Sequence, residues 1–361
     1  MIHSQTLNMA KKRSKQQHLL IVRFAAMGDV AIAAPVVAVL RADHPDLRIT
    51  LLTRKGLVPF FRDIERIEFF FPDFTGRHKG FWGICRLWRD LLRLKATHFV
   101  DLHDVFRTKL LRRLMRLGGV PYAVINKGGR EKQLLTRKFR KEFKPLKPTV
   151  ERYREAIVRC GYPFLLPETA GRSLRPIPAV IASRVRSKSG IWVGVAPFAK
   201  HRGKIYPTAQ VDELISLLAG SYKRVFLFGG GVYEREFTEC MEERHGKKVI
   251  SVIGRLSLPD EMDLIANLDV MVTMDSASMH IASIVGTPVV SVWGATHPHT
   301  GFYGFGQYPG DAVQLALPCR PCSVYGNRPC VYKDYRCLTR IAPATIFARV
   351  KRTIKRTRRR V

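Results

Sequence analysis

The sequence lacks a long hydrophobic run. A membrane-spanning helix needs about 18 or more consecutive apolar residues, and the apolar stretch from Val30 to Leu40 is shorter and contains Pro35. No secretory signal follows the basic start, because Leu19 to Phe24 has the length of a strand and no cleavage-type ending. We therefore expect a cytoplasmic protein.

Acidic residues are also scarce. The 361 residues include 62 Lys and Arg but only 29 Asp and Glu, which gives a formal net charge of +33. Such a charge suits a polyanionic partner: nucleic acid, anionic lipid or a phosphorylated glycolipid. The sequence contains no helix-turn-helix, zinc-finger or RNP motif, so we do not expect nucleic acid, although a non-catalytic nucleic-acid binder remains the alternative. The basic residues concentrate in Lys11–Lys15, Arg86–Arg116, Lys127–Lys147 and Lys351–Arg360.

Strand-like apolar segments alternate with helix-like segments along the chain, which predicts an α/β protein with parallel sheets. In the first half we expect strands near Leu19–Phe24, Arg48–Thr53, Ile67–Phe71, His98–Leu102 and Tyr122–Ile125, and helices near Val30–Ala42, Phe81–Leu94, Lys109–Leu117 and Val150–Cys160. In the second half we expect strands near Ile191–Ala196, Arg224–Phe228, Val249–Ile253, Val270–Thr273 and Pro288–Trp293, and helices near Pro207–Leu218, Tyr233–His245, Pro259–Leu268, Ser276–Val285 and Ala344–Arg356.

A proline-rich stretch from Tyr162 to Pro178 separates the two similar halves. We predict a disordered basic tail over residues 1–17, a Rossmann-like domain over 18–165, a linker over 166–179 and a second Rossmann-like domain over 180–340. Residues 341–361 are expected to form a basic helix that could pack back on the first domain. The two domains would face a cleft, lined by the carboxyl ends of both sets of strands.

Asp29 follows the first expected strand, in the segment Ala25-Ala26-Met27-Gly28-Asp29-Val30. Its carboxylate can stabilise the start of the next helix through the helix dipole, or it can act as a general base that faces the cleft. The second half of the chain favours the catalytic interpretation, because its strand ends carry the features of an anion site.

The strand near Val270–Thr273 is followed by Asp275-Ser276-Ala277-Ser278-Met279-His280, where small residues open a helix. Free N–H groups and the positive end of the dipole make such a start an anion site, although Asp275 or Ser276 can equally be an N-cap. Lys204, on the loop after another strand, can neutralise a phosphate leaving group. The sequence contains no Asp-x-Asp pair, the usual metal motif of nucleotide-sugar sites, so we expect no metal cofactor for this step.

A glycine triplet, Gly229-Gly230-Gly231, ends a further strand and precedes Glu234. Three glycines permit close approach of a ligand to the backbone. Glu234 can accept hydrogen bonds from ribose hydroxyls, or it can only compensate the helix dipole. The triplet alone is weak evidence for a nucleotide site.

These elements together resemble the bacterial heptosyltransferases of glycosyltransferase family nine, over roughly residues 19–354. The resemblance implies two Rossmann-like domains of the glycosyltransferase-B type, the first for the acceptor and the second for an ADP-sugar. It also implies inverting transfer of heptose to a lipopolysaccharide core acceptor, with no cofactor required. The segments that carry it are Met27-Gly28-Asp29-Val30, Lys204-Ile205-Tyr206-Pro207, Asp275 to His280, and Gly286-Thr287-Pro288.

The resemblance assigns roles to single residues. Asp29 would be the catalytic base, Lys204 would contact the diphosphate and Glu234 the ribose. Leu256 would pack on adenine. The acceptor would be an anionic glycolipid (lipid A with its Kdo core) at the inner face of the cytoplasmic membrane, and a nucleotide-sugar epimerase of the same architecture is the other enzyme that we consider. Phosphate and sugar would be held by Asp275, Ser276, Ala277 and His280. Family members often carry Trp where this chain has Tyr206, and Thr-Gly in place of Ser276-Ala277.

Candidate acceptor residues follow the strand near His98–Leu102. Arg107 is a candidate for binding an acidic sugar, and His103 or Asp104 could assist; alternatively, the loop provides only a helix cap and a solvated arginine. The aromatic and arginine-rich helix expected near Phe81–Leu94 suits either a membrane surface or core packing.

Four cysteines near the C-terminus have the spacing C-x₂-C-x₇-C-x₆-C. They can bind Zn²⁺ or remain free thiols, and only the first pair has the short spacing of a metal site. The residues are Cys319, Cys322, Cys330 and Cys337.

Overall fold

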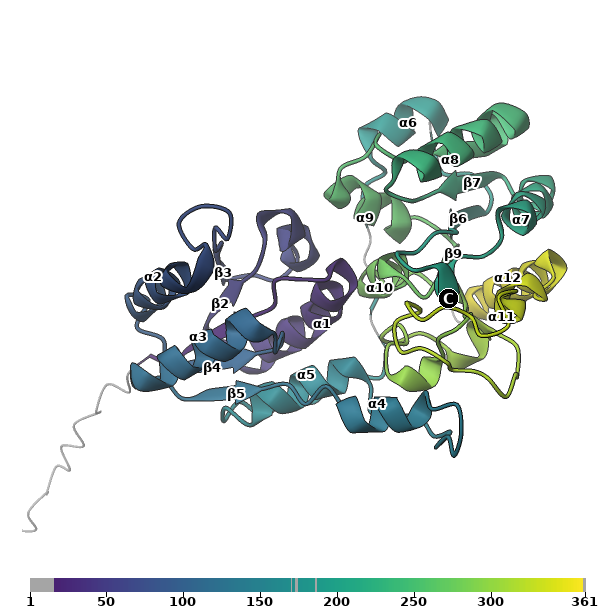
Figure 1. The fold of residues 1–361 in the computed structure, drawn as a ribbon. Coiled ribbons are helices and arrows are strands. Elements are labelled where there is room, and N and C mark those ends of the chain that lie inside the picture. The colour runs from purple at the N-terminus through teal and green to yellow at the C-terminus, as the bar shows by residue number, and fades with distance from the viewer. Residues whose placement is uncertain (1–15, 170, 173–174, 186, 360–361) are drawn as a thin grey trace, which may run out of the picture.

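The chain forms two α/β domains, each built on a parallel sheet (Figure 1). The structure is a computed structural model that describes residues 16–169, 171–172, 175–185 and 187–359. Most of the tail predicted over residues 1–17 therefore lies outside the described residues. No helix in the described ranges combines the length and the apolar character that crossing a membrane requires.

The sheet of the first domain has five strands in the order β3-β2-β1-β4-β5. All five residues of β1 are buried, as expected for a parallel strand that is covered on both faces. Helices α1 and α5 cover one face of this sheet, and α2 and α3 cover the other. The strands are β1 (His18–Val22), β2 (Arg48–Leu52), β3 (Ile67–Phe70), β4 (His98–Asp101) and β5 (Tyr122–Val124). The helices are α1 (Met27–Asp43), α2 (Gly80–Leu92), α3 (Phe106–Leu117), α4 (Gly129–Leu135) and α5 (Thr149–Val158), with the short 3-10 helix η1 (Lys55–Phe61).

The sheet of the second domain has six strands in the order β11-β10-β9-β6-β7-β8. The strands are β6 (Trp192–Ala196), β7 (Arg224–Leu227), β8 (Val249–Ser251), β9 (Val270–Met274), β10 (Val289–Val292) and β11 (Ala312–Val313). The α-helices are α6 (Ala179–Val185), α7 (Thr208–Ser221), α8 (Val232–His245), α9 (Leu258–Ala266), α10 (Ala277–Ile284), α11 (Arg336–Thr339) and α12 (Pro343–Arg358). The 3-10 helices are η2 (Arg202–Lys204), η3 (Gly246–Lys248), η4 (Pro298–Thr300) and η5 (Pro309–Asp311).

The strand order of each sheet reverses at one point. In the first sheet the reversal lies between β1 and β4, and in the second it lies between β6 and β9. The helices that leave two such neighbouring strands lie on opposite faces, which opens a crevice at the strands' carboxyl ends where ligands bind. Asp29 follows β1, Lys204 follows β6 and Asp275 follows β9. The topology therefore brings the sequence-predicted residues to the two ligand-binding positions of the fold.

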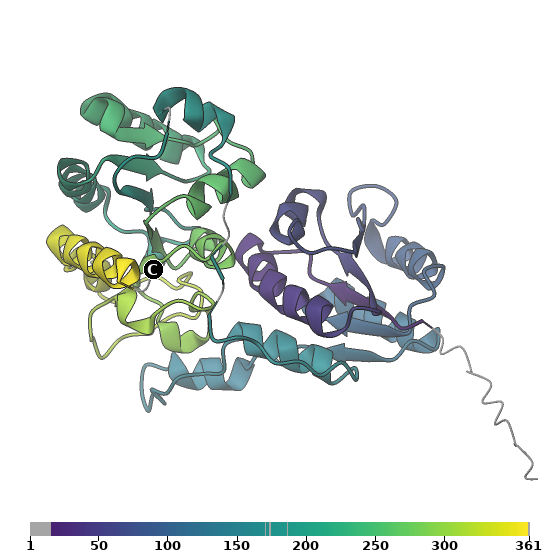
Figure 2. The same cartoon turned by 180° about the vertical axis from the view of Figure 1, so that it is seen from behind.

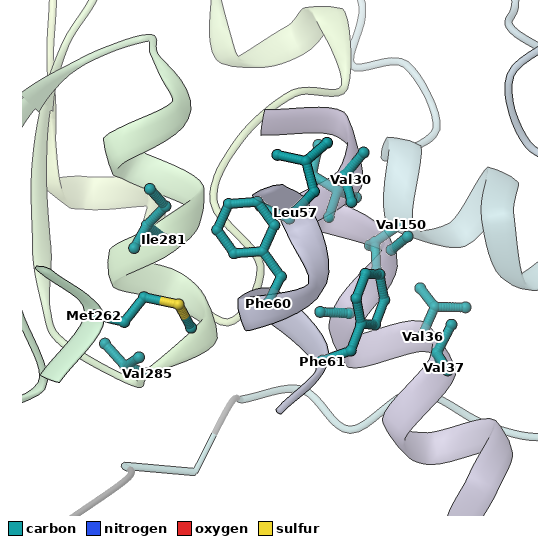
Figure 3. Packing of buried hydrophobic residues seen from close by; sticks show 14 of the residues in the cluster. Val30, Val36, Val37, Leu57, Phe60, Phe61, Val150, Met262, Ile281 and Val285 are labelled. Carbon is teal, nitrogen blue, oxygen red and sulfur yellow. The ribbon is translucent and has the colours of Figure 1, made fainter. Parts of the chain in front are cut away.

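The two domains contact each other through α1 and α10, which pack side by side (Figures 1 and 2). One hydrophobic cluster runs across this boundary. In Figure 3, Leu57 and Phe60 of η1 face Met262 of α9 and Ile281 of α10. The burial of these side chains orients the domains, because separating them would expose the apolar surface.

A second connection between the domains is made by the chain that leads into α5. The segment between α4 and α5 extends along the second domain, where the Leu146 N–H donates to the His299 carbonyl (3.0 Å) and the Thr149 N–H donates to the Gly301 carbonyl (2.7 Å). Helix α12 packs against α7 and the second sheet, with Val350 and Ile354 in the second domain's own cluster. The expected packing of this helix on the first domain is therefore wrong, since its apolar face matches the second sheet.

Candidate active site

Asp29 lies in the first turn of α1, which begins at Met27 rather than at the predicted Val30. Its Oδ2 accepts a hydrogen bond from the Ala26 N–H (3.3 Å) and lies 2.5 Å from Nη2 of Arg23. Arg23 is held in turn, because its Nη1 donates to the carbonyl of Leu102 (2.7 Å), the residue that follows β4. The carboxylate thus supports the helix start, as one interpretation of the sequence expects, and it also lines two cavities, while its role as a general base stays a prediction.

The larger cavity, of about 730 Å³, lies between the domains. One wall is the start of α1, from Ala26 to Asp29, and the opposite walls come from the loops after β6, β7 and β9. We call it the donor cavity. Of the predicted donor residues it is lined by Lys204, Glu234, Asp275, Ser276, Ala277 and His280.

An ion pair joins the two loops at the reversal point of the second sheet. Lys204 Nζ lies 2.7 Å from Asp275 Oδ2, and Asp275 is almost fully buried. Directly beside this pair, Ser276 is the N-cap of α10, whose eight residues begin at Ala277. A cation and a helix N-terminus that line one cavity are suited to bind a diphosphate.

His280 is buried on the face of α10 that contacts the first domain. Burial lowers the pKa of His280 to about 4, so its ring is neutral at pH 7. Its Nδ1 has no hydrogen-bond partner among the described residues. The ring is a neutral polar group at the point where the donor cavity meets Gly28.

Glu234 folds back over the glycine triplet. Its Oε2 accepts a hydrogen bond from the Gly230 N–H (2.7 Å), and a Cβ added at Gly229 would lie 2.6 Å from the same oxygen. The glycines therefore allow the loop to close on the carboxylate. This places Glu234 in the wall of the donor cavity.

The predicted adenine-packing residue, Leu256, does not line the donor cavity; Leu258 and Glu261 of α9 do. Glu261 forms no hydrogen bond or ion pair through its side chain with any other described residue. Its removal from water raises the pKa of this carboxyl to about 7.

The smaller cavity, of about 250 Å³, lies on the first-domain side of Asp29. We call it the basic cavity, because four of its lining residues are cations and only one, Asp29, is acidic. Ala26, Asp29, Phe302 and Tyr325 line both cavities. The residues around the basic cavity are Arg23, Ala25, Ala26, Asp29, His103, Val105, Ile125, Lys127, Lys132, Thr149, Arg152, Tyr153, Phe302 and Tyr325.

Of the three predicted acceptor residues, only His103 lines this cavity. Burial lowers its pKa to about 4, assisted by Arg23 and Lys127. Asp104 instead accepts a hydrogen bond from Arg112 Nη1 (2.7 Å), and the Arg107 guanidinium lies 4.8 Å from the centre of the Phe74 ring. The loop after β4 thus brings His103 to the site and directs Asp104 and Arg107 elsewhere.

The four C-terminal cysteines form no disulfide bonds. Among residues 16–359, apart from those few whose structure is not described, no three His, Cys, Asp or Glu side chains are grouped to hold a metal ion. The geometry therefore does not support the Zn²⁺ site that the spacing allows. The loop that carries these cysteines has another role in the fold: a Cβ on its Gly326 would lie 2.6 Å from the Lys204 side chain, so the loop packs directly on Lys204.

The sequence did not single out several lining residues. Tyr325 and Phe302 lie in irregular segments without hydrophobic periodicity, so no pattern points to them. Lys127 and Lys132 belong to a basic segment that was visible in the sequence, but their burial depends on the tertiary fold.

Comparison with known proteins agrees with this geometry. The model of glycosyltransferase family 9 (heptosyltransferase) matches residues 84–333. Lipopolysaccharide heptosyltransferase 3 of Escherichia coli is 24% identical over 284 residues, which cover 74% of this chain and 81% of that protein.

Two solved structures share the fold. The E. coli ADP-heptose lps heptosyltransferase II has a TM-score of 0.68 at 19% identity, with 95% of this chain and 100% of that chain covered. The E. coli heptosyltransferase WaaC with ADP has a TM-score of 0.63 at 18% identity, with 93% of this chain and 100% of that chain covered. With two Rossmann-like domains around a cleft and the family match over most of its length, this chain belongs to glycosyltransferase family 9, the heptosyltransferases, and is a glycosyltransferase.

Proposed function

We propose that this enzyme transfers heptose, or a closely related sugar, from an ADP-sugar to an acceptor of the lipopolysaccharide core, with inversion at the anomeric carbon. One observation carries the proposal: Asp29 lies in the wall shared by the donor cavity and the basic cavity. A base in that position can reach a hydroxyl bound on one side and a sugar bound on the other.

In the proposed reaction, Asp29 accepts the proton of the acceptor hydroxyl as its oxygen attacks the anomeric carbon. The new C–O bond forms while the bond from that carbon to the phosphate oxygen breaks, and ADP leaves with the bonding electron pair. Attack from the face opposite to the leaving group inverts the anomeric carbon. Lys204 and the N–H groups at the start of α10 stabilise the charge that develops on the diphosphate. The proposed step therefore needs no bound metal ion.

The names of similar proteins support the choice of donor. One of them is an ADP-heptose transferase and another is described with ADP. We propose that Glu234 binds the ribose and that Leu258 packs on the base, since both residues line the donor cavity. We therefore propose ADP as the nucleotide.

The mechanism is tested by Asp29→Asn, which keeps the size of the side chain and removes its basicity. We expect transfer to fall by about a thousand-fold or more, while ADP still protects the variant against thermal unfolding. Transfer above a tenth of the wild-type rate would remove Asp29 from the role of base. Absence of ADP binding by the wild type would contradict the donor assignment.

We also propose that the enzyme binds the anionic inner surface of the cytoplasmic membrane. Helices α2 and α3 begin at the carboxyl edge of the first sheet and expose Phe81, Trp82 and Phe106, with Trp82 74% and Phe106 83% exposed. Arg86 and Arg89, on the same helix as Phe81 and Trp82, are also exposed. Apolar side chains beside cations suit an anionic bilayer surface. Binding to phosphatidylglycerol vesicles should weaken with salt and with Trp82→Ser; equal binding to neutral vesicles would contradict the proposal.

A further inference from the structure

Glu261 is the acidic residue of α9 that the fold itself does not use. Helix α9 contains three acidic residues, Asp260, Glu261 and Asp263. Asp260 exchanges hydrogen bonds with the N-cap Ser257 (Oγ to Oδ2, 2.6 Å), so the helix start is already satisfied. Asp263 pairs with Arg62 of the first domain. Among the described residues, Glu261 has no hydrogen-bond or ion-pair partner, yet its side chain lines the donor cavity.

The surroundings of Glu261 are apolar. Leu258 and Ile265 lie three residues before it and four after it, on the same face of α9, and both line the donor cavity. Removal from water raises the pKa of Glu261 to about 7, with no contribution from a charged group of the described chain. Much of this carboxyl is therefore protonated at neutral pH, when it can donate one hydrogen bond and accept another. A polar group held in this way costs free energy unless a ligand pairs with it.

The sheet places Glu261 in line with the two residues proposed to hold the donor. Lys204 follows β6, Glu234 follows β7 and Glu261 follows β8, and these strands are direct neighbours. All three side chains line the donor cavity. Neighbouring strands lie about 4.8 Å apart, so the loop after β8 is on the order of 10 Å from the loop after β6. A nucleotide with its diphosphate at Lys204 and its ribose at Glu234 therefore brings its base to Glu261.

Adenine presents an edge that matches a protonated carboxyl. Its 6-amino group donates a hydrogen bond, and the ring nitrogen beside that group accepts one. We infer that Glu261 recognises adenine in the donor: its carbonyl oxygen accepts from the 6-amino group, and its O–H donates to the adjacent ring nitrogen. The inference rests on the proposed function, because the diphosphate and the ribose fix the position of the base. It gives this chain a polar base contact on α9, whereas the resemblance assigned only an apolar one, Leu256.

The test compares ADP with purine riboside 5′-diphosphate, which has a hydrogen in place of the 6-amino group. Both ligands are titrated by calorimetry at pH 6 against the full-length wild type, Glu261→Met, Glu261→Gln and Glu236→Met. Glu236 is the matched control, since it is exposed on α8 and does not line the cavity. The ratio of the two dissociation constants isolates the contact with the amino group, because the diphosphate and the ribose are common to both ligands.

We expect the wild type and Glu236→Met to bind ADP about five-fold or more tightly than the analogue, as the loss of one hydrogen bond to a buried group predicts. In Glu261→Met this preference should fall below about two-fold. Glu261→Gln should keep the preference, because its amide also has one donor and one acceptor side by side. A residue that only supports the cavity would change the affinity for both ligands equally and leave the ratio unchanged.

The inference is wrong if the wild type binds both ligands equally, if Glu261→Met keeps the wild-type ratio, or if Glu261→Gln loses the preference as Glu261→Met does. Failure of the proposed function has a different signature, a wild type that binds neither ADP nor the analogue.

Discussion

A Cβ added to Gly28 would lie 3.0 Å from Cδ2 of His280, across the boundary between the two domains. The same Cβ would lie 3.5 Å from Cα of Ala277, the first residue of α10. Glycine thus lets α1 approach the start of α10, which lines the donor cavity. Because Asp29 is the next residue, the approach sets the distance between the proposed base and the proposed leaving-group site.

Gly28→Ala should therefore reduce transfer by about ten-fold or more, since a displacement of a few tenths of an ångström between reacting groups is costly. Its control is Gly220→Ala in α7, where an added Cβ meets nothing within 4 Å. Alanine in place of a helical glycine stabilises by about 0.5–1 kcal/mol, so Gly220→Ala should gain stability and keep activity. Steady-state kinetics and urea unfolding compare the two variants. A fully active Gly28→Ala would show that the close approach is not required.

Lys204→Gln should weaken ADP binding. The lysine is the cation nearest to Asp275 at the reversal point of the second sheet, and a charge-assisted contact to a phosphate contributes about 1.5–3 kcal/mol. We expect the dissociation constant for ADP to rise by about ten-fold or more, whereas adenosine, which has no phosphate, should bind both proteins equally.

Lys247→Gln removes an exposed lysine outside the cavity and is the matched control. Calorimetric titration measures both ligands on each protein. Equal loss of ADP and adenosine binding in Lys204→Gln would indicate a distorted cavity rather than a lost phosphate contact.

The strands and the donor loops could be predicted from the sequence, because they depend on local patterns. The buried run of β9 and the small residues after it predict a strand followed by a helix that can bind an anion, and the structure has both. The same local reasoning placed Asp29 and Lys204 after strands. In a parallel sheet, all loops that follow strands lie at the carboxyl edge, so their position does not depend on the rest of the sequence.

The acceptor side could not be predicted in the same way. Position after a strand favours Arg107, yet its side chain turns to Phe74, and Lys132 reaches the cavity from the short helix α4. Nothing in the sequence distinguishes a buried lysine from its exposed neighbours, since burial is decided by residues far along the chain such as Phe302. The net charge belongs to the whole surface and suggested a non-catalytic nucleic-acid binder as the alternative. The family match shows instead that the chain is an enzyme.

Glu261→Gln should stabilise the protein in a pH-dependent way. Burial raises the pKa of Glu261 from 4.5 to about 7 in the folded state. As pH rises from about 4.5 to 7, the unfolded chain loses this proton while the folded protein retains it, so wild-type stability falls across this range. At 1.36 kcal/mol per pKa unit, the loss is on the order of 3 kcal/mol. The side-chain amide of Gln does not ionise, so the Glu261→Gln variant does not lose this stability as pH rises.

Urea unfolding at pH 5 and at pH 8 measures the effect. The stability difference between Glu261→Gln and wild type should be small at pH 5 and larger at pH 8. Glu236, exposed on α8, supplies the matched control variant Glu236→Gln, which removes a carboxylate that is in contact with water. A constant difference for Glu261→Gln would show that this carboxyl is solvated.

Lys132→Met should stabilise the free enzyme. Desolvation lowers the pKa of Lys132 from 10.5 to about 8, and the charges that face it are Arg152, Asp29, Lys127 and Glu131. Below pH 8 the folded protein bears the full cost of the buried charge. Between about pH 8 and 10.5 the cost disappears, because the folded state releases the proton first, and above 10.5 neither state is charged.

The variant should therefore be more stable than wild type by on the order of 3 kcal/mol at pH 7, with the advantage vanishing by about pH 10.5. Comparing the two proteins at each pH cancels the titration of the other lysines. A residue kept for packing alone would behave in the opposite way, because Lys132→Met would then destabilise the enzyme at pH 7.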